Sequence, residues 1–233
     1  MDPRQLSADS RSVGQCVFCG CEPGTSDHVP SKILLDNPLP ADLPTVDACA
    51  SCNASFSLDE EYLACFLECV ICGTAEPRTL GRVKVSRALA RNPSLAERIR
   101  SSLRESDGDS LVWVPEEDRV RRIVVKLARG HAAYELSLPQ IDEPIGVSVS
   151  PLVLMSDSER TTLESADAGG LRGWPEIGSR AFCRAAGVRP YAGQSGPWNN
   201  VQEGRYRYAV DQDGGVCVRL VLSEYLACTV EWE

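Results

Sequence analysis

Two pairs of cysteines near the N-terminus have the spacing of a metal site. Cys16 and Cys19 form one C-x-x-C pair, and Cys49 and Cys52 form a second pair that 29 residues separate from the first. Two such pairs can supply four thiolates to one tetrahedral zinc ion, each pair on its own knuckle. A four-thiolate site has no open coordination position, so we expect this zinc to stabilise the fold without taking part in catalysis. The alternative is a set of buried structural thiols.

Three further polar residues accompany the cysteine pairs. Asp27 and His28 lie between the two pairs, and Asn53 follows the last cysteine directly. A carboxylate and an amide oxygen are hard ligands that suit Mg²⁺ or a similar ion, and the adjacent imidazole can take a proton from water. The alternative for Asp27 and His28 is a loop aspartate that caps a turn beside a surface histidine.

This arrangement resembles the HNH, or ββα-metal, nucleases, and among them the phage recombination endonuclease VII type, in which two C-x-x-C knuckles bracket an Asp-His pair and an Asn follows the last cysteine. The segments 27–32 and 53–62 are also similar to segments of bacterial HNH proteins. The resemblance implies that Asp27 and Asn53 hold a catalytic Mg²⁺ or Mn²⁺ and that His28 activates the attacking water. It also implies a nucleic-acid substrate, with DNA favoured over RNA, and it covers about residues 15–62.

Two features depart from the HNH pattern. The region before the second knuckle, residues 43–47, lacks the central Asn that braces the loop bearing the catalytic histidine, and the nearest Asn, Asn37, lies earlier. Phe56 and Ser57 stand where a basic residue often follows the last knuckle. An endonuclease is the function that the resemblance implies. The alternative is a non-catalytic zinc-binding module that presents a surface to nucleic acid or to a protein.

Charge is unevenly distributed along the 233 residues. The net charge of −9 argues against a nucleic-acid-binding surface over the whole chain. Between Arg78 and His131, however, 13 basic residues stand against seven acidic ones. We expect a helix in this segment whose exposed side, with Arg122, Lys126 and Arg129, contacts phosphates. Its other side is expected to be an apolar stripe formed by Val120, Ile123, Val124 and Leu127. The alternative is a solvated helix face that the acidic flanks balance.

The composition also predicts a compartment. A chain of this size, 43% hydrophobic, can fold without disulfides, so its 11 cysteines need another explanation. Residues 1–6 lack the apolar segment of a signal peptide, and no stretch approaches the ~18 apolar residues of a membrane span. We therefore expect a cytoplasmic protein that enters no membrane and whose clustered cysteines bind metal. The sequence leaves open whether the chain acts with a partner protein or as a homodimer.

The elements that position these residues predict an α+β chain. Its expected parts are a loose arm over 1–14, a zinc-stapled ββα-metal module over 15–75, a basic helical segment over 76–136, and a β-rich region with an antiparallel sheet over 137–233. Helices are predicted from the capping box 57–60, over 79–90, from Ser94, from Pro115 and over 180–186. Strands are predicted at 145–154, 206–210, 216–222 and 225–232.

The remaining cysteines and the second histidine are predicted to be structural. Cys65, Cys69 and Cys72 lie on the predicted helix after residue 57, where we expect buried thiols. Cys21 is a spare thiol near the first knuckle that could compete as a ligand. His131 follows Gly130 near the expected end of the basic helix. Tryptophans 174, 198 and 232 are expected in the core or in strands.

Overall fold

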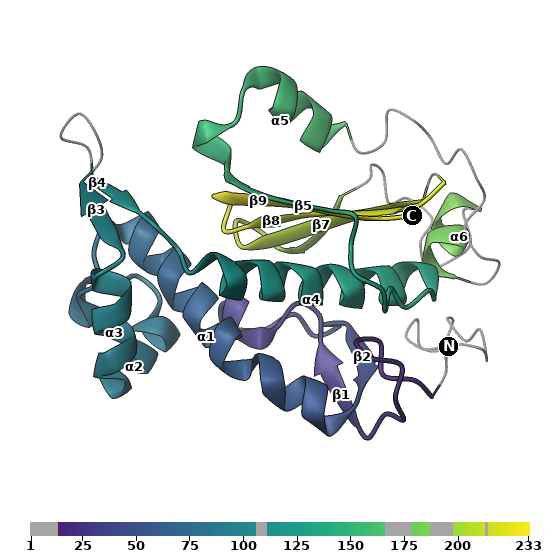
Figure 1. Ribbon diagram of the computed structural model, residues 1–233, viewed down its shortest axis with the longest axis horizontal. Helices are drawn as coiled ribbons and strands as arrows, with labels where there is room; N and C mark the ends of the chain where they lie inside the picture. The colour runs from purple at the N-terminus through teal and green to yellow at the C-terminus, as the bar shows by residue number, and fades with distance from the viewer. Residues whose placement is uncertain (1–13, 106–110, 166–178, 187–197, 213) are drawn as a thin grey trace. The chain divides into compact units, whose positions relative to one another are not determined.

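The computed structural model describes residues 14–105, 111–165, 179–186, 198–212 and 214–233 (Figure 1). The predicted arm, apart from Gly14, and Trp174 lie outside the described residues. The chain folds into two compact units, one made of Met1–Ser55 with Val124–Glu233 and the other of Phe56–Ile123. Among the described residues, none of the helices combines the length and the hydropathy that a membrane span requires. The division of the chain into parts that end at residues 75 and 136 remains a prediction.

The first unit begins with a hairpin that leads into a long helix. Strands β1 (Thr25–His28) and β2 (Thr45–Ala48) pair antiparallel, with His28 opposite Thr45, and α1 (Ala50–Cys72) follows at once. The helix therefore begins seven residues before the capping box at Ser57, and the start predicted there is wrong. The chain enters the helix directly from the second cysteine pair, because the Asn53 amide already donates to the Cys49 carbonyl oxygen at 3.0 Å.

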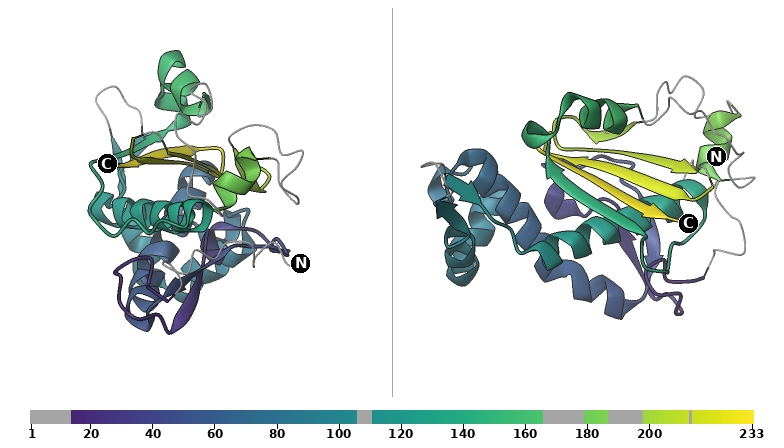
Figure 2. Two further views of the ribbon diagram at one scale, coloured as in Figure 1. Left: turned by 90° about the vertical axis from the view of Figure 1, so that its right-hand side faces the viewer. Right: turned by 45° about the horizontal axis from the view of Figure 1, so that its top comes forward.

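A five-stranded antiparallel sheet forms the C-terminal part of the same unit. Its strands lie in the order β5-β9-β8-β7-β6, and Figure 2 (right) shows them side by side. The strands predicted at 206–210, 216–222 and 225–232 are confirmed as β7, β8 and β9, and β6 was not predicted from the sequence. The strand bounds are β5 (Gly146–Pro151), β6 (Asn199–Gln202), β7 (Tyr206–Gln212), β8 (Val216–Leu222) and β9 (Leu226–Trp232).

Helices cover both faces of this sheet. Helix α4 (Glu117–Leu136), from Val124 onward, contacts the face that carries Tyr206 and Tyr208, because the His131 ring stacks on the Tyr208 ring at 3.6 Å between centroids. Helix α5 (Asp157–Glu164) buries Leu163 against Val221 and Ala227 on the opposite face. Alternate residues of a strand point to opposite faces, so the two layers draw on different residues of β7 and β8. A short helix, α6 (Arg180–Ala185), precedes β6.

Helix α4 also packs against the N-terminal hairpin region. A Cβ atom at Gly130 would lie 2.6 Å from Val29 Cγ2, so only glycine lets α4 approach the residue that follows β1 this closely. Ile123, Val124 and Leu127 of α4 are fully buried, as the predicted apolar stripe requires. His131 is also fully buried in the interior of α4 rather than at its end.

The second unit is mainly helical. Its middle holds α2 (Val83–Arg91) and α3 (Pro93–Arg100), where the Asn92 side chain caps α3 by accepting from the Leu95 amide at 3.1 Å. A small hairpin follows, made of β3 (Leu103–Glu105) and β4 (Leu111–Trp113). The helix predicted to start at residue 79 begins only at Val83, because Arg82 has extended backbone angles. The α+β class with a helical middle and a C-terminal antiparallel sheet is thus confirmed.

Candidate functional site

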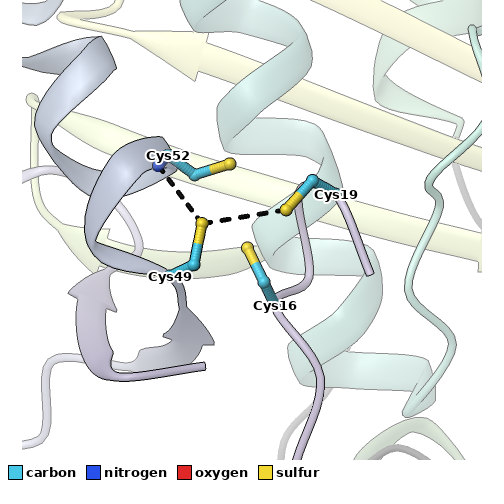
Figure 3. A group of neighbouring side chains, drawn as sticks. All are labelled: Cys16, Cys19, Cys49 and Cys52. Atoms are coloured by element: carbon cyan, nitrogen blue, oxygen red, sulfur yellow. Dashed lines mark hydrogen bonds between the residues drawn. The ribbon is translucent and has the colours of Figure 1, made fainter. Parts of the chain in front are cut away.

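The four cysteines of the two pairs converge on one point (Figure 3). The Sγ atoms of Cys16, Cys19, Cys49 and Cys52 all lie within 4.8 Å of one another, and Cys19 Sγ lies 3.7 Å from Cys49 Sγ. With Zn–S bonds of about 2.3 Å, the edge of a tetrahedral site is about 3.8 Å long. The cluster can therefore hold a zinc ion with little rearrangement.

Local backbone geometry forms the first knuckle. The amides of Cys19 and Gly20 both donate to the Cys16 carbonyl oxygen, at 3.3 and 2.8 Å, and the Cys16 amide donates to the Cys21 carbonyl oxygen at 2.8 Å. Gly20 has φ +75°, a left-handed angle that favours glycine. The Val17 amide donates to the Asp47 carbonyl oxygen on β2 at 3.0 Å, which fixes this knuckle to the hairpin.

The second knuckle lies at the start of α1. The Cys52 amide donates to Cys49 Sγ at 3.3 Å, and this hydrogen bond fixes the Cys49 sulfur at the start of the helix. Burial, followed by hydrogen bonds with the neighbouring thiols, raises the pKa of Cys52 above its ordinary value. Cation binding by these thiols must therefore release protons.

The other cysteines lie outside this cluster. Cys21 is exposed and is not a member of the four-sulfur group. Cys65 and Cys69 are fully buried, and burial raises the pKa of each thiol to about 12, so both are inert structural thiols as predicted. Cys72, by contrast, is exposed, since it occupies the last turn of α1.

Asp27, on β1, forms an ion pair with a buried lysine of α4. Lys126 Nζ lies 2.7 Å from Asp27 Oδ2, and the same ammonium donates to Ser31 Oγ at 2.9 Å. The side-chain exposure is 0% for Lys126 and 13% for Asp27. The prediction that Lys126 shares an exposed basic face is therefore wrong. Because its ammonium is buried against a carboxylate and a hydroxyl, Lys126 is not available to a phosphate of a bound ligand.

His28 ends β1, next to Asp27, and is partly buried. Burial lowers the pKa of His28 below its ordinary value, and the positive charges of Lys32 and Lys126 lower it further, whereas the Asp27 carboxylate opposes the shift. The imidazole is consequently neutral at pH 7 and able to accept a proton.

Asn53, in the first turns of α1, is hydrogen-bonded to the strand that carries Asp27 and His28. Its Nδ2 donates to Thr25 Oγ1 at 3.2 Å and to the Ser26 carbonyl oxygen at 3.4 Å. The Thr25 hydroxyl in turn donates to the Ala48 carbonyl oxygen on β2 at 2.9 Å. The amide nitrogen is thus used to anchor Asn53 to β1, and its Oδ1 remains as the oxygen donor for a ligand.

The two other predicted phosphate contacts have partners within the chain. Arg122 Nη1 donates to Asp59 Oδ2 at 2.8 Å, within the second unit. Arg129 Nη2 donates to the carbonyl oxygens of Ile141 and Asp142 at 3.0 and 2.9 Å. Their contact with nucleic acid stays a prediction.

Sequence reasoning missed Lys126, Ser31 and Thr25 as neighbours of the candidate site. The sequence contains a signal for Lys126, because this lysine is the one polar residue in the run 123–128. In the structure all six residues of the run are buried. A lysine inside such a run needs a partner, and carboxylates are the usual ones. Ser31 and Thr25 carry no comparable signal, since small hydroxyl residues occur in most loops and strands.

Comparison of the chain with protein-family models, with curated proteins and with solved structures finds no match.

Proposed function

We propose that the chain is a metal-dependent endonuclease of the HNH type that hydrolyses phosphodiester bonds, with DNA as the favoured substrate. The observation that supports this proposal best is the anchoring of Asn53 to β1. In the order β1-β2-α1, this contact joins the first turns of the helix to the strand that carries Asp27 and His28. The three residues of the sequence motif thus belong to one hydrogen-bonded unit.

The four-cysteine cluster would hold a zinc ion that stabilises this unit. Both knuckles are fixed to the elements of the candidate site, the first through Val17 to β2 and the second through Cys49 to α1. A saturated thiolate site stabilises the fold and leaves no position for a substrate. Zinc would accordingly position the catalytic residues rather than react.

The donor set fits a hard divalent cation such as Mg²⁺ or Mn²⁺. Asp27 contributes a carboxylate and Asn53 an amide oxygen, which are the ligand types that such ions prefer. The bound ion would stabilise the negative charge that develops on the phosphate and on the leaving oxygen. Lys126 restrains Asp27 through Oδ2, so Oδ1 is the carboxylate oxygen that remains for the ion.

His28 would act as the general base. Its neutral imidazole takes a proton from a water molecule while the water oxygen forms its bond to phosphorus and the bond to the leaving oxygen breaks. The lowered pKa keeps the base in its neutral form at pH 7.

The alternative is a zinc-binding module without catalytic activity. The Lys126 ammonium favours it, because this charge balances the one carboxylate of the donor set and weakens its attraction for a divalent cation. In this alternative the cluster and hairpin present a binding surface, and Asp27 serves only the ion pair.

Cleavage assays on matched variants separate the two functions. Wild type, His28→Ala, Asp27→Ala and Asn53→Ala are purified identically and assayed with plasmid and single-stranded DNA across Mg²⁺, Mn²⁺ and other divalent ions. We expect His28→Ala to lose about 10²–10⁴-fold in rate at unchanged zinc content. We expect Asp27→Ala and Asn53→Ala to need a higher concentration of the divalent ion before activity disappears.

The matched control is Asp47→Ala, which removes an exposed carboxylate from the paired strand β2. It should cleave like wild type. Absence of cleavage by wild type with every ion would reject the nuclease. Equal cleavage by wild type and His28→Ala would reject the catalytic assignment and indicate a contaminating nuclease.

A further inference from the structure

A strongly basic stretch covers α2 and the residues on either side of it. Residues 77–96 contain five basic and no acidic residues, in a chain with a net charge of −9. One of the five, Arg82, is buried at 6% exposure, and its amide donates to Glu68 Oε1 at 2.8 Å. The other four, including three on α2 itself, are exposed.

The three basic residues of α2 lie on one side of the helix. Lys84, Arg87 and Arg91 are spaced i, i+3 and i+7, so they fall within an arc of about 60° at 3.6 residues per turn. The buried residues of the helix occupy the other side, namely Val85, Ala88 and Leu89. We call the side formed by Lys84, Arg87 and Arg91 the α2 basic face.

Helix α2 itself carries no acidic residue. Arg91 Nε donates to the Arg87 carbonyl oxygen at 3.2 Å, and neither arginine forms an ion pair with an acid in the described part of the chain. The neighbouring arginines differ in this respect. Arg98 pairs with Glu116 at 3.5 Å, Arg100 pairs with Glu97, and Arg119 pairs with Asp59 at 3.3 Å.

We propose that the α2 basic face binds the sugar-phosphate backbone of nucleic acid. A regular row of cations on one helix side complements the regular phosphate charges of a duplex, and such contacts release condensed counterions. Three phosphate contacts would give the binding a salt dependence that the acidic net charge of the chain does not predict. The identity of the partner rests on the proposed nuclease function, whereas the face itself rests on the charges and exposure of α2.

The test measures the salt dependence of binding to a short fluorescein-labelled DNA duplex by fluorescence anisotropy. The triple variant Lys84→Gln/Arg87→Gln/Arg91→Gln removes the face with side chains that keep good helix propensity. The matched control Arg98→Gln/Arg100→Gln/Arg119→Gln removes the same charge from arginines that are already paired. Circular dichroism and zinc content establish that each variant is folded.

Removal of three phosphate contacts should reduce the slope of log K against log salt by about 2.7. Wild type should then lose about 40-fold more affinity than the triple variant between 50 and 200 mM salt. The control variant should keep a slope close to that of wild type. In cleavage assays we expect the triple variant to raise KM and to leave kcat unchanged.

Other outcomes overturn the inference or separate it from the nuclease proposal. An unchanged slope in the triple variant would overturn it, even if wild type cleaves DNA. Tighter binding of a labelled polyglutamate peptide than of DNA, lost in the triple variant, would also overturn it, because the face would then serve an acidic protein. A reduced slope in a protein that cleaves nothing would support the face and reject the nuclease.

Discussion

Lys126 Nζ of α4 lies 2.7 Å from Asp27 Oδ2 of β1, with the lysine side chain fully buried. The ammonium also donates to Ser31 Oγ and lies 5.8 Å from the centre of the Phe18 ring. A buried charge is costly unless it is paired and hydrogen-bonded, and these contacts meet that requirement. The pair links a helix far along the sequence to the strand that carries the candidate catalytic residues.

The first prediction follows from the burial of this pair. Lys126→Met should lower the free energy of unfolding by about 3 kcal/mol, because it leaves the Asp27 carboxylate without its cation. Lys126→Met/Asp27→Asn should recover part of this loss, since no charge is then left unpaired. Urea denaturation of the single and double variants measures both effects. The exposed Lys32→Met is the control and should stay within about 0.5 kcal/mol of wild type. If the losses of stability in the single variants Lys126→Met and Asp27→Asn simply add up in the double variant, this would contradict the pairing.

The second prediction concerns the four-cysteine cluster. We expect one zinc ion per chain, and Cys16→Ser or Cys49→Ser should release it and unfold the N-terminal module, because a closed site contributes folding free energy directly. Elemental analysis and thermal unfolding measure the two effects. Cys21→Ser, next to the first knuckle but outside the cluster, should keep its zinc. A folded protein free of metal would contradict this prediction, and zinc loss from Cys69→Ser/Cys72→Ser would locate the site elsewhere.

Local signals in the sequence were sufficient for several elements. Strand β8 spans the predicted residues 216–222, whose residues are all apolar except Arg219 and are rich in valine. The apolar stripe of α4 is likewise confirmed, since Ile123, Val124 and Leu127 are buried. At these positions the hydrophobic period and the tertiary burial agree.

Tertiary contacts decided the elements that sequence reasoning missed. The capping box at Ser57 is a sound local signal, yet the second knuckle begins α1 at Ala50 and overrides it. On a helical wheel Lys126 lies with its basic neighbours, but α4 is buried on most sides along 123–128. Because the hairpin and the sheet both pack on α4, no single amphipathic face describes this part of the helix.

The candidate site was only partly accessible from the sequence. The four cysteines could be grouped because C-x-x-C spacing encodes a local knuckle, and two knuckles suffice for one tetrahedral ion. The contacts of Asp27 and Asn53 could not be predicted, since they depend on Lys126, 99 residues beyond Asp27, and on the register that places Thr25 opposite Ala48. Such long-range partners leave no spacing pattern.

The third prediction is a loss of stability in acid that depends on His131. Its Nε2 contacts the Tyr206 hydroxyl at 2.9 Å, and complete burial lowers the pKa of His131 well below its ordinary value of about 6.5. The unfolded chain therefore binds a proton that the folded chain rejects, so stability falls as the pH drops below about 6.5. The loss should reach about 1.4 kcal/mol per pH unit in this range.

Thermal or urea unfolding of wild type and His131→Gln between pH 7 and pH 5 checks this prediction. His131→Gln should be less stable at pH 7 and less sensitive to acid, because glutamine does not titrate. His28→Gln is the control, since His28 is only partly buried, and it should keep most of the acid sensitivity. Equal acid sensitivity in wild type and His131→Gln would assign the effect to other groups.

The last prediction concerns Thr25, whose hydroxyl joins the two strands to α1. Its Oγ1 accepts from Asn53 Nδ2 at 3.2 Å and donates to the Ala48 carbonyl oxygen at 2.9 Å. Thr25→Val keeps the shape of the side chain and removes both hydrogen bonds, so Asn53 loses the contact that orients its amide. A positioning contact of this kind contributes about 1 kcal/mol, which corresponds to a rate reduction of roughly fivefold.

We therefore expect Thr25→Val to cleave more slowly and to need more Mn²⁺ for half-maximal rate, at unchanged zinc content. Thr25→Ser retains the hydroxyl and should restore both values, which a role in strand packing alone would not explain. The measurement is the Mn²⁺ dependence of cleavage for wild type and the two variants. If Thr25→Val keeps the wild-type metal dependence while Asn53→Ala loses activity, the Thr25 hydroxyl does not position Asn53, and the Ser26 carbonyl contact alone holds it.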